Sequence, residues 1–319
     1  IRDSDRSRGL GDVYKRQIVG SASMGNILTK QFYRQRKDFE DSCAGRDSVL
    51  TFPEGVRCST DIAYADDGIK AHVLDIYRPE DSQEKILPVI INVHGGGLII
   101  GNKEFNRYFC ALLCKKGFLV YSIEYRLIPD CLIYDQIADV FMAMDYIKER
   151  LAADGGDSSH VYMAGDSGVA CLITYANAIQ NSTNIARAAN VTPSGLRINA
   201  LGLISGMFYT SRFDKIGLFL PKYLYGRDYK KTSFAKYVNP ENRELLNSLA
   251  PVWLVTSHND FLRRYTTDFE KALTRAEREH ELVIFPKNKK LTHAFSVFEP
   301  FMPESGAVID MMVEYLRKF

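Results

Sequence analysis

Two glycine-rich segments, each directly after an apolar run, hold the residue types of acyl-transfer chemistry. His94-Gly95-Gly96-Gly97 follows the largely apolar residues 87–93, and Gly165-Asp166-Ser167-Gly168 follows residues 161–164. Glycines leave backbone N–H groups open to a negatively charged oxygen. A serine on a sharp turn between a strand and a helix exposes its hydroxyl as a nucleophile. In this order the two segments predict a serine hydrolase.

A serine nucleophile requires a base, and we expect His293 to supply it. This histidine follows the last predicted strand, residues 282–285, and so lies at the edge where active sites of parallel sheets gather. His72, His160 and His280 lie within or at the start of predicted strands, which favours structural roles for them.

An acid must orient the histidine and stabilise the imidazolium, and Asp260 is the candidate. It follows the predicted strand 252–256 and therefore emerges at the same edge as His293. The chain order Ser167, Asp260, His293 is typical of hydrolases built on a mostly parallel sheet. We expect His258, two residues before the acid, to contact the catalytic residues from behind or to line the pocket.

The glycine segments also predict an oxyanion hole. The N–H of Gly168, directly after the nucleophile, is expected to act with the N–H groups of Gly95 and Gly96. We expect His94 to hold the glycine turn through side-chain hydrogen bonds, and Asp166 to support the site beside the serine.

These side chains need a scaffold, and the rest of the chain alternates between strand and helix patterns. Such alternation predicts an α/β fold with a mostly parallel sheet and helices on both faces. The remaining predicted strands cover residues 61–64, 72–77, 89–93, 119–123 and 200–205. The predicted helices cover residues 21–42, 105–116, 134–151, 167–180, 265–278 and 305–319.

Two segments do not fit this alternation. Residues 207–248 are rich in phenylalanine and tyrosine, and residues 21–58 precede the first hairpin; both are expected to form a helical cap. Residues 59–206 and 249–319 then form the catalytic domain. Residues 1–20 lack periodicity and are expected to be disordered or non-native.

Composition excludes several classes of function. The 319-residue chain has a formal net charge of +2 with interspersed acids and bases, which argues against a nucleic-acid partner. No apolar run approaches the roughly 20 residues needed to cross a bilayer, so we expect no stable membrane insertion. The six cysteines show no disulfide rhythm and favour a cytoplasmic protein with free thiols. The sequence leaves open whether the protein forms a homodimer.

The motifs resemble those of the hormone-sensitive-lipase-like branch of the α/β-hydrolase superfamily, also called the bacterial carboxylesterase or acetyl-esterase group. The resemblance runs from about Asp61 to the carboxyl terminus. It implies an eight-stranded α/β-hydrolase fold with a helical cap, no metal or other cofactor, and short-chain esters as substrates. The motifs that carry it are His94 to Gly97, Tyr125 to Asp130, Asp139, Gly165 to Ser167, Asp260, and His293 to Phe295.

One residue departs from the family pattern Gly-x-Ser-x-Gly, whose last position here is Val169. A β-branched side chain adds bulk to a tight turn. Either the neighbouring residues are small enough to absorb it, or the turn is displaced. Gly168, where the family often has alanine, is expected to return some room.

The sequence therefore predicts a carboxylesterase that cleaves short-chain esters through an acyl-enzyme on Ser167. Two alternatives stay open: a non-catalytic ligand-binding protein on the same scaffold, and a hydrolase of amides or lactones.

Overall fold

The computed structural model describes residues 24–82 and 85–319, with side chains inside the first helix described from Leu28 onward. The expectation of disorder for residues 1–20 lies outside this part of the chain.

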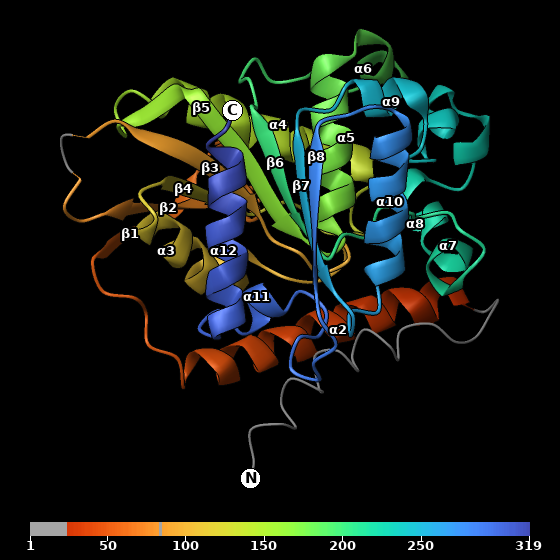
Figure 1. Cartoon of the computed structure of the whole chain (residues 1–319). Helices are drawn as coiled ribbons and strands as arrows, with labels where there is room; N and C mark the ends of the chain where they lie inside the picture. The colour runs from red at the N-terminus through yellow and green to blue at the C-terminus, as the bar shows by residue number, and fades with distance from the viewer. Residues whose placement is uncertain (1–23, 83–84) are drawn as a thin grey trace.

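An eight-stranded sheet forms the centre of the molecule, in the order β1-β2-β4-β3-β5-β6-β7-β8 (Figure 1). Strand β2 runs antiparallel to β1 and β4, and the other neighbours are parallel. The predicted mostly parallel eight-stranded sheet is confirmed. The strands are β1 (Val56–Ala63), β2 (Val73–Pro79), β3 (Leu87–Val93), β4 (Leu119–Ile123), β5 (Gly156–Asp166), β6 (Ala200–Ile204), β7 (Val252–Ser257) and β8 (His280–Phe285).

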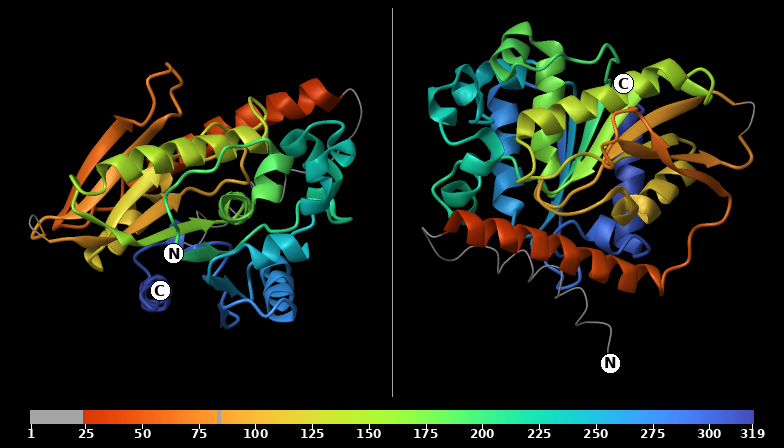
Figure 2. Two further views of the ribbon diagram at one scale, coloured as in Figure 1. Left: turned by 90° about the horizontal axis from the view of Figure 1, so that it is seen from above. Right: turned by 180° about the vertical axis from the view of Figure 1, so that it is seen from behind.

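The central strands are apolar because both of their faces are covered. Every residue of β4, β6 and β7 is buried, the pattern expected of parallel strands with helices on either side. Helices α3 and α12 pack together on one face, and α4 packs with α5 on the other; the rear view shows α4 in front of the strands and α12 behind them (Figure 2). The helices that follow the strands are α3 (Arg107–Lys115), α4 (Ile133–Arg150), α5 (Val169–Asn181), α6 (Thr183–Ala189), α10 (Arg263–Arg275), α11 (Phe295–Phe298) and α12 (Pro303–Leu316).

Helix starts differ from the sequence prediction at two functional positions. A 3-10 helix, η2 (Lys103–Asn106), precedes α3. Helix α5 begins at Val169, two residues later than predicted, because Ser167 adopts a left-handed conformation with a φ of 57°. Such a φ cannot continue a right-handed helix.

The segments outside the alternating pattern lie beside the sheet. Helix α2 (Met24–Asp47) runs across the lower edge of the molecule in Figure 1. Within the described part of 21–58 it is one helix, and Val56 already begins β1. Phe32 of α2 contacts Tyr223, with ring centroids 5.4 Å apart, so α2 meets the 207–248 segment. That segment holds α7 (Lys215–Phe219), α8 (Pro221–Tyr225), η3 (Tyr229–Lys231), η4 (Ser233–Tyr237) and α9 (Arg243–Asn247).

Candidate active site

Ser167 stands on a sharp turn between β5 and α5. Its backbone N–H donates to the carbonyl of Ile204 at 2.8 Å, and its carbonyl accepts from the N–H of Met207 at 2.9 Å. These bonds tie the turn to the end of β6. A left-handed φ at a non-glycine residue costs free energy, so the surrounding bonds must hold it in place.

The structure brings Ser167, His293 and Asp260 together from three separate loops. The Oγ of Ser167 lies 2.9 Å from Nε2 of His293, and Nδ1 of His293 lies 2.8 Å from Oδ1 of Asp260. The carboxylate can only accept, so Nδ1 carries the proton and Nε2 is left to accept from the serine hydroxyl. All three residues are buried. This is the geometry of a nucleophile, a base and an orienting acid.

The carboxylate of Asp260 is held in its charged form. Burial alone would raise its pKa, but His293 and the hydrogen bonds to the carboxylate hold that pKa below its ordinary value. The donors besides His293 are the N–H of Leu262 at 2.9 Å and the hydroxyl of Thr256 at 2.8 Å. An ionised acid beside the histidine stabilises an imidazolium.

Two serines that sequence reasoning did not single out hold the loop that carries His293. The N–H of Ala294 donates to Oγ of Ser205 at 3.0 Å, and Oγ of Ser257 donates to the carbonyl of Leu291 at 2.5 Å. Both serines are buried at the carboxyl ends of β6 and β7. The available sequence signal was their position, since Ser205 ends one predicted strand and Ser257 directly follows another.

The N–H of Gly95 is used within the protein. It donates to Oδ1 of Asp166 at 3.0 Å, so it is committed to that carboxylate and not to a substrate. This corrects the expectation that Gly95 is an oxyanion donor. Within residues 24–82 and 85–319, no hydrogen bond takes the N–H of Gly96, Gly97 or Gly168.

The turn that carries these N–H groups requires glycine. Gly96 and Gly97 have φ values of 120° and 63°, a backbone region that favours glycine. A Cβ atom on Gly96 would collide with the carbonyl of Ile100, and one on Gly168 would lie 2.5 Å from the Cα of Gly97. The glycine turn (residues 95–97) and the serine elbow (residues 165–169) are therefore in direct backbone contact.

Asp166 links the elbow to the glycine turn. Besides the N–H of Gly95, its Oδ1 accepts from Nδ2 of Asn106 at 3.1 Å. Complete burial raises the pKa of this carboxyl above its ordinary value. Asp166, expected to support the site, therefore contacts the glycine turn. Its partner Asn106 was not singled out from the sequence.

Both ring nitrogens of His94 contact acceptors at the glycine turn. Nε2 lies 3.0 Å from Oε1 of Glu124, and Nδ1 lies 2.9 Å from the carbonyl of Gly95. Both partners are acceptors, which suits an imidazolium with two donors. Burial opposes that charge, but Glu124 raises the pKa of His94 above its ordinary value. The ring of Tyr125 stacks on His94, with the centroids 4.6 Å apart.

Gly165 accommodates the bulk of Val169. The side chain of Val169 is fully buried, and a Cβ atom on Gly165 would collide with its Cγ1. The first glycine of the elbow thus leaves the room that the valine fills, which matches the first of the two alternatives raised by this departure from the family pattern.

The other histidines lie outside this cluster. His258, expected to contact the catalytic residues from behind or to line the pocket, is exposed, and its Nδ1 accepts from Arg263 at 2.8 Å. His72 precedes β2 and contacts Asp139 at 3.1 Å. His160 is exposed within β5, and His280 opens β8.

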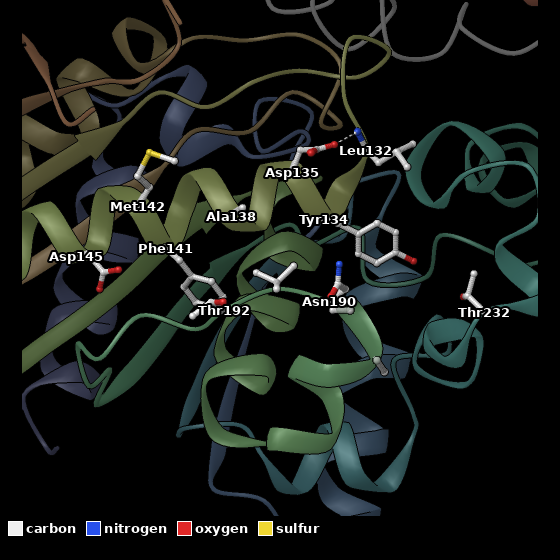
Figure 3. Close-up of a pocket in the computed structure, with 13 residues that line it drawn as sticks. Leu132, Tyr134, Asp135, Ala138, Phe141, Met142, Asp145, Asn190, Thr192 and Thr232 are labelled. Atoms are coloured by element: carbon white, nitrogen blue, oxygen red, sulfur yellow. Dashed lines mark hydrogen bonds between the residues drawn. The ribbon is translucent and has the colours of Figure 1, made fainter. Parts of the chain in front are cut away.

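A groove of about 690 Å³ lies between α4 and the residues after α6, and Ser167, Asp260 and His293 do not line it (Figure 3). Tyr134 and Phe141 of α4 contribute to one side, and Asn190 and Thr192 to the other.

No group of three or more potential metal ligands occurs among the described residues. Across the same residues, no helix is long and apolar enough to cross a membrane.

The family follows from comparison with known proteins. A family model described as alpha/beta hydrolase fold matches residues 90–296, and the chain belongs to this family. The predicted fold and the expected place in the hormone-sensitive-lipase-like branch are confirmed.

Three individual proteins show how far the similarity extends. The chain is 29% identical over 184 residues to a probable isoprenylcysteine alpha-carbonyl methylesterase of Oryza sativa subsp. japonica, a match that covers 54% of this chain and 44% of the rice protein. The tributyrin phosphonate structure of esterase B from Lactobacillus rhamnosis is similar with a TM-score of 0.85 and 22% identity, over 92% of this chain and 96% of that one. A bacterial heroin esterase is similar with a TM-score of 0.68 and 21% identity, over 91% and 92%.

Proposed function

We propose that this protein is a carboxylesterase that hydrolyses short-chain esters through an acyl-enzyme on Ser167. The observation that carries the proposal is the continuous hydrogen-bonded chain from Ser167 through His293 to Asp260, with distances of 2.9 and 2.8 Å. A base within this distance can take the serine proton as the hydroxyl attacks a carbonyl carbon.

The steps follow from the positions of these groups. Ser167 attacks the ester carbonyl while Nε2 of His293 takes its proton, and Asp260 stabilises the imidazolium. His293 then returns the proton to the leaving alcohol. A water molecule, deprotonated by the same nitrogen, then attacks the acyl-enzyme. The bond between the acyl carbon and Oγ of Ser167 breaks, His293 returns the proton to Oγ, and the acid is released.

The oxyanion of each tetrahedral intermediate is assigned to the N–H groups of Gly96, Gly97 and Gly168. Two observations support this assignment. No hydrogen bond among the described residues uses these donors, and the backbones of Gly97 and Gly168 are in contact beside Ser167. Removing one such donor typically slows turnover about 10² to 10³-fold.

Two observations favour an ester as the substrate. The similar proteins include a methylesterase by name, an esterase bound to a tributyrin phosphonate and a heroin esterase. Phe261 contacts His293, with ring centroids 4.4 Å apart, and keeps 38% of its surface exposed, so it offers apolar area beside the base for an acyl or alcohol group.

The test is hydrolysis of p-nitrophenyl acetate, butyrate and octanoate by the wild type and by Ser167→Ala. We expect turnover that is highest for the short chains and falls at least about 10³-fold in the variant, because the nucleophile is lost. No Ser167-dependent turnover on any ester would contradict the proposal. Dependence on Ser167 with p-nitroanilides or lactones alone would assign the site to those bonds instead.

A further inference from the structure

A single arginine of helix α2 reaches two loops beside the site. Nε of Arg36 donates to the carbonyl of Ile99 at 2.8 Å, and Nη2 donates to the carbonyl of Ile128 at 2.7 Å. Nη1 pairs with Asp130, also at 2.7 Å. The planar guanidinium presents its donors in a fixed fork, so three contacts in two loops fix its position closely.

The Ile99 contact falls on the turn that carries the proposed oxyanion donors. The N–H groups of Ile99 and Ile100 both donate to the carbonyl of Gly96, at 3.1 and 3.0 Å. These two bonds close the turn. Arg36 holds the carbonyl of Ile99 in the same segment.

The carbonyl of Leu98, the residue before Ile99, is also held. It accepts from the N–H of Ile128 at 3.0 Å and from Nε2 of Gln136 at 3.1 Å. Ile128 is itself bound by Arg36 through its own carbonyl. The guanidinium therefore connects the 96–100 turn and the 126–130 loop, which already contact each other.

Burial distinguishes Arg36 from Arg34, which lies two residues earlier on the same helix. Its side chain is 18% exposed, whereas that of Arg34 is 83% exposed and lies 3.9 Å from the carboxylate of Asp38. Tyr33 also donates to Asp130. Partial burial would raise the pKa of Asp130, but the bonds from Tyr33 and Arg36 hold that pKa below its ordinary value, so the pair stays charged.

We propose that Arg36 is a positioning residue for the oxyanion hole. By holding the carbonyl of Ile99, it fixes the peptide whose N–H, that of Ile100, bonds the carbonyl of Gly96, and so it sets the direction of the Gly97 N–H in the same peptide unit as that carbonyl. This inference rests on the esterase function proposed above. It makes the rate of the chemical step depend on helix α2, although α2 supplies none of the reacting groups.

The physical reason is the steep dependence of transition-state stabilisation on donor geometry. Oxyanion donors act at about 2.7–3.1 Å from the position that the oxyanion will occupy, and a displacement of about 1 Å can cost about 10²-fold in rate. A loosened turn affects the oxyanion more than the uncharged substrate. The loss should therefore appear in kcat and not in KM.

The kinetic test compares Arg36→Met, Arg36→Lys and Arg34→Met on p-nitrophenyl acetate. For Arg36→Met we expect kcat to fall about ten- to hundredfold with KM within about twofold, and the affinity for a trifluoromethyl ketone to fall in parallel. Arg36→Lys keeps the charge near Asp130 but loses the fork, so its kcat should also fall while its melting temperature stays close to that of the wild type. Arg34→Met, on the exposed face of the same helix, should match the wild type.

Amide hydrogen exchange tests the contact without relying on activity. The exchange of the Ile99 and Ile100 amides should be faster in Arg36→Met than in Arg34→Met, because their bonds to Gly96 open more often.

The outcomes separate the two proposals. An unchanged kcat in Arg36→Met, an increase in KM alone, or unchanged exchange in the turn would overturn the positioning role and leave the esterase proposal intact. Absence of Ser167-dependent turnover in the wild type would instead overturn the esterase proposal and the catalytic role of Arg36 with it.

Discussion

A close backbone contact joins Gly168 of the serine elbow to Gly97 of the glycine turn. A Cβ atom at position 168 would lie 2.5 Å from the Cα of Gly97 and 2.9 Å from its nitrogen. Backbone atoms cannot yield as the end of a flexible side chain does. At the scale of single residues, the absence of one methyl group thus keeps two of the proposed oxyanion donors together.

Gly168→Ala should therefore slow hydrolysis, although alanine suits the helix start that follows. We expect kcat to fall at least about tenfold, because the turn must move away from the elbow and its donors move with it. Steady-state kinetics on p-nitrophenyl acetate measures the effect. The matched control is Gly306→Ala in α12, where an added Cβ meets nothing within 4 Å. Equal kcat values in the two variants would show that the contact is unimportant.

At the scale of elements, the site depends on loops that leave neighbouring strands and bind one another. The loop after β3 is tied to the residue after β4 through His94 and Glu124. Glu124 also accepts from the N–H of Lys103 at 2.8 Å, so it connects the start of η2 to the same cluster. The loop after β8 is tied to β6 and β7 through Ser205 and Ser257. These bonds fix elements that the sheet alone would leave free to move.

The His94–Glu124 pair gives a pH-dependent contribution to the free energy of unfolding. The pKa of His94 is raised in the folded protein, so the protonated ring stabilises the fold fully below its unfolded pKa of about 6.5. That contribution is lost as the pH rises through the folded pKa. Glu124→Gln should therefore lower the free energy of unfolding more at about pH 6 than at about pH 9.

Urea unfolding of the wild type and Glu124→Gln at the two pH values measures this difference. The exposed Glu80→Gln substitution serves as the control for the loss of one carboxylate. A loss of stability that is equal at both pH values, or larger at the higher one, would exclude a charged His94.

At the scale of the whole molecule, the sequence predicted the strands well where both faces are buried, as for β4 and β7, because their residues are almost continuously apolar. Ser167 and Asp260 were candidates because each follows a strand whose carboxyl end is buried, and His293 because it follows the half-buried edge strand β8. The sequence placed the start of α5 too early, since the left-handed conformation of Ser167 has no signature in residue type.

Hydrogen bonds between distant parts of the chain could not be predicted from the sequence. Three consecutive glycines look equivalent in the sequence, and only the fold shows that Asp166 takes the N–H of Gly95. Arg36 resembles any other basic residue of an amphipathic helix, yet its acceptors lie 63 and 92 residues further along the chain. Pairings of this kind depend on how the elements pack, which no local pattern specifies.

The role of Ser167 as the nucleophile is tested by covalent labelling with a p-nitrophenyl alkylphosphonate, which mimics the tetrahedral intermediate on the serine. Intact mass and peptide mapping should show one phosphonyl group per chain, on Ser167, formed in proportion to the loss of esterase activity. Ser167→Ala should stay unlabelled, and His293→Ala should react far more slowly because the base is missing. Inactivation without an adduct on Ser167, or ester hydrolysis that survives complete labelling of Ser167, would contradict a nucleophilic role for this serine.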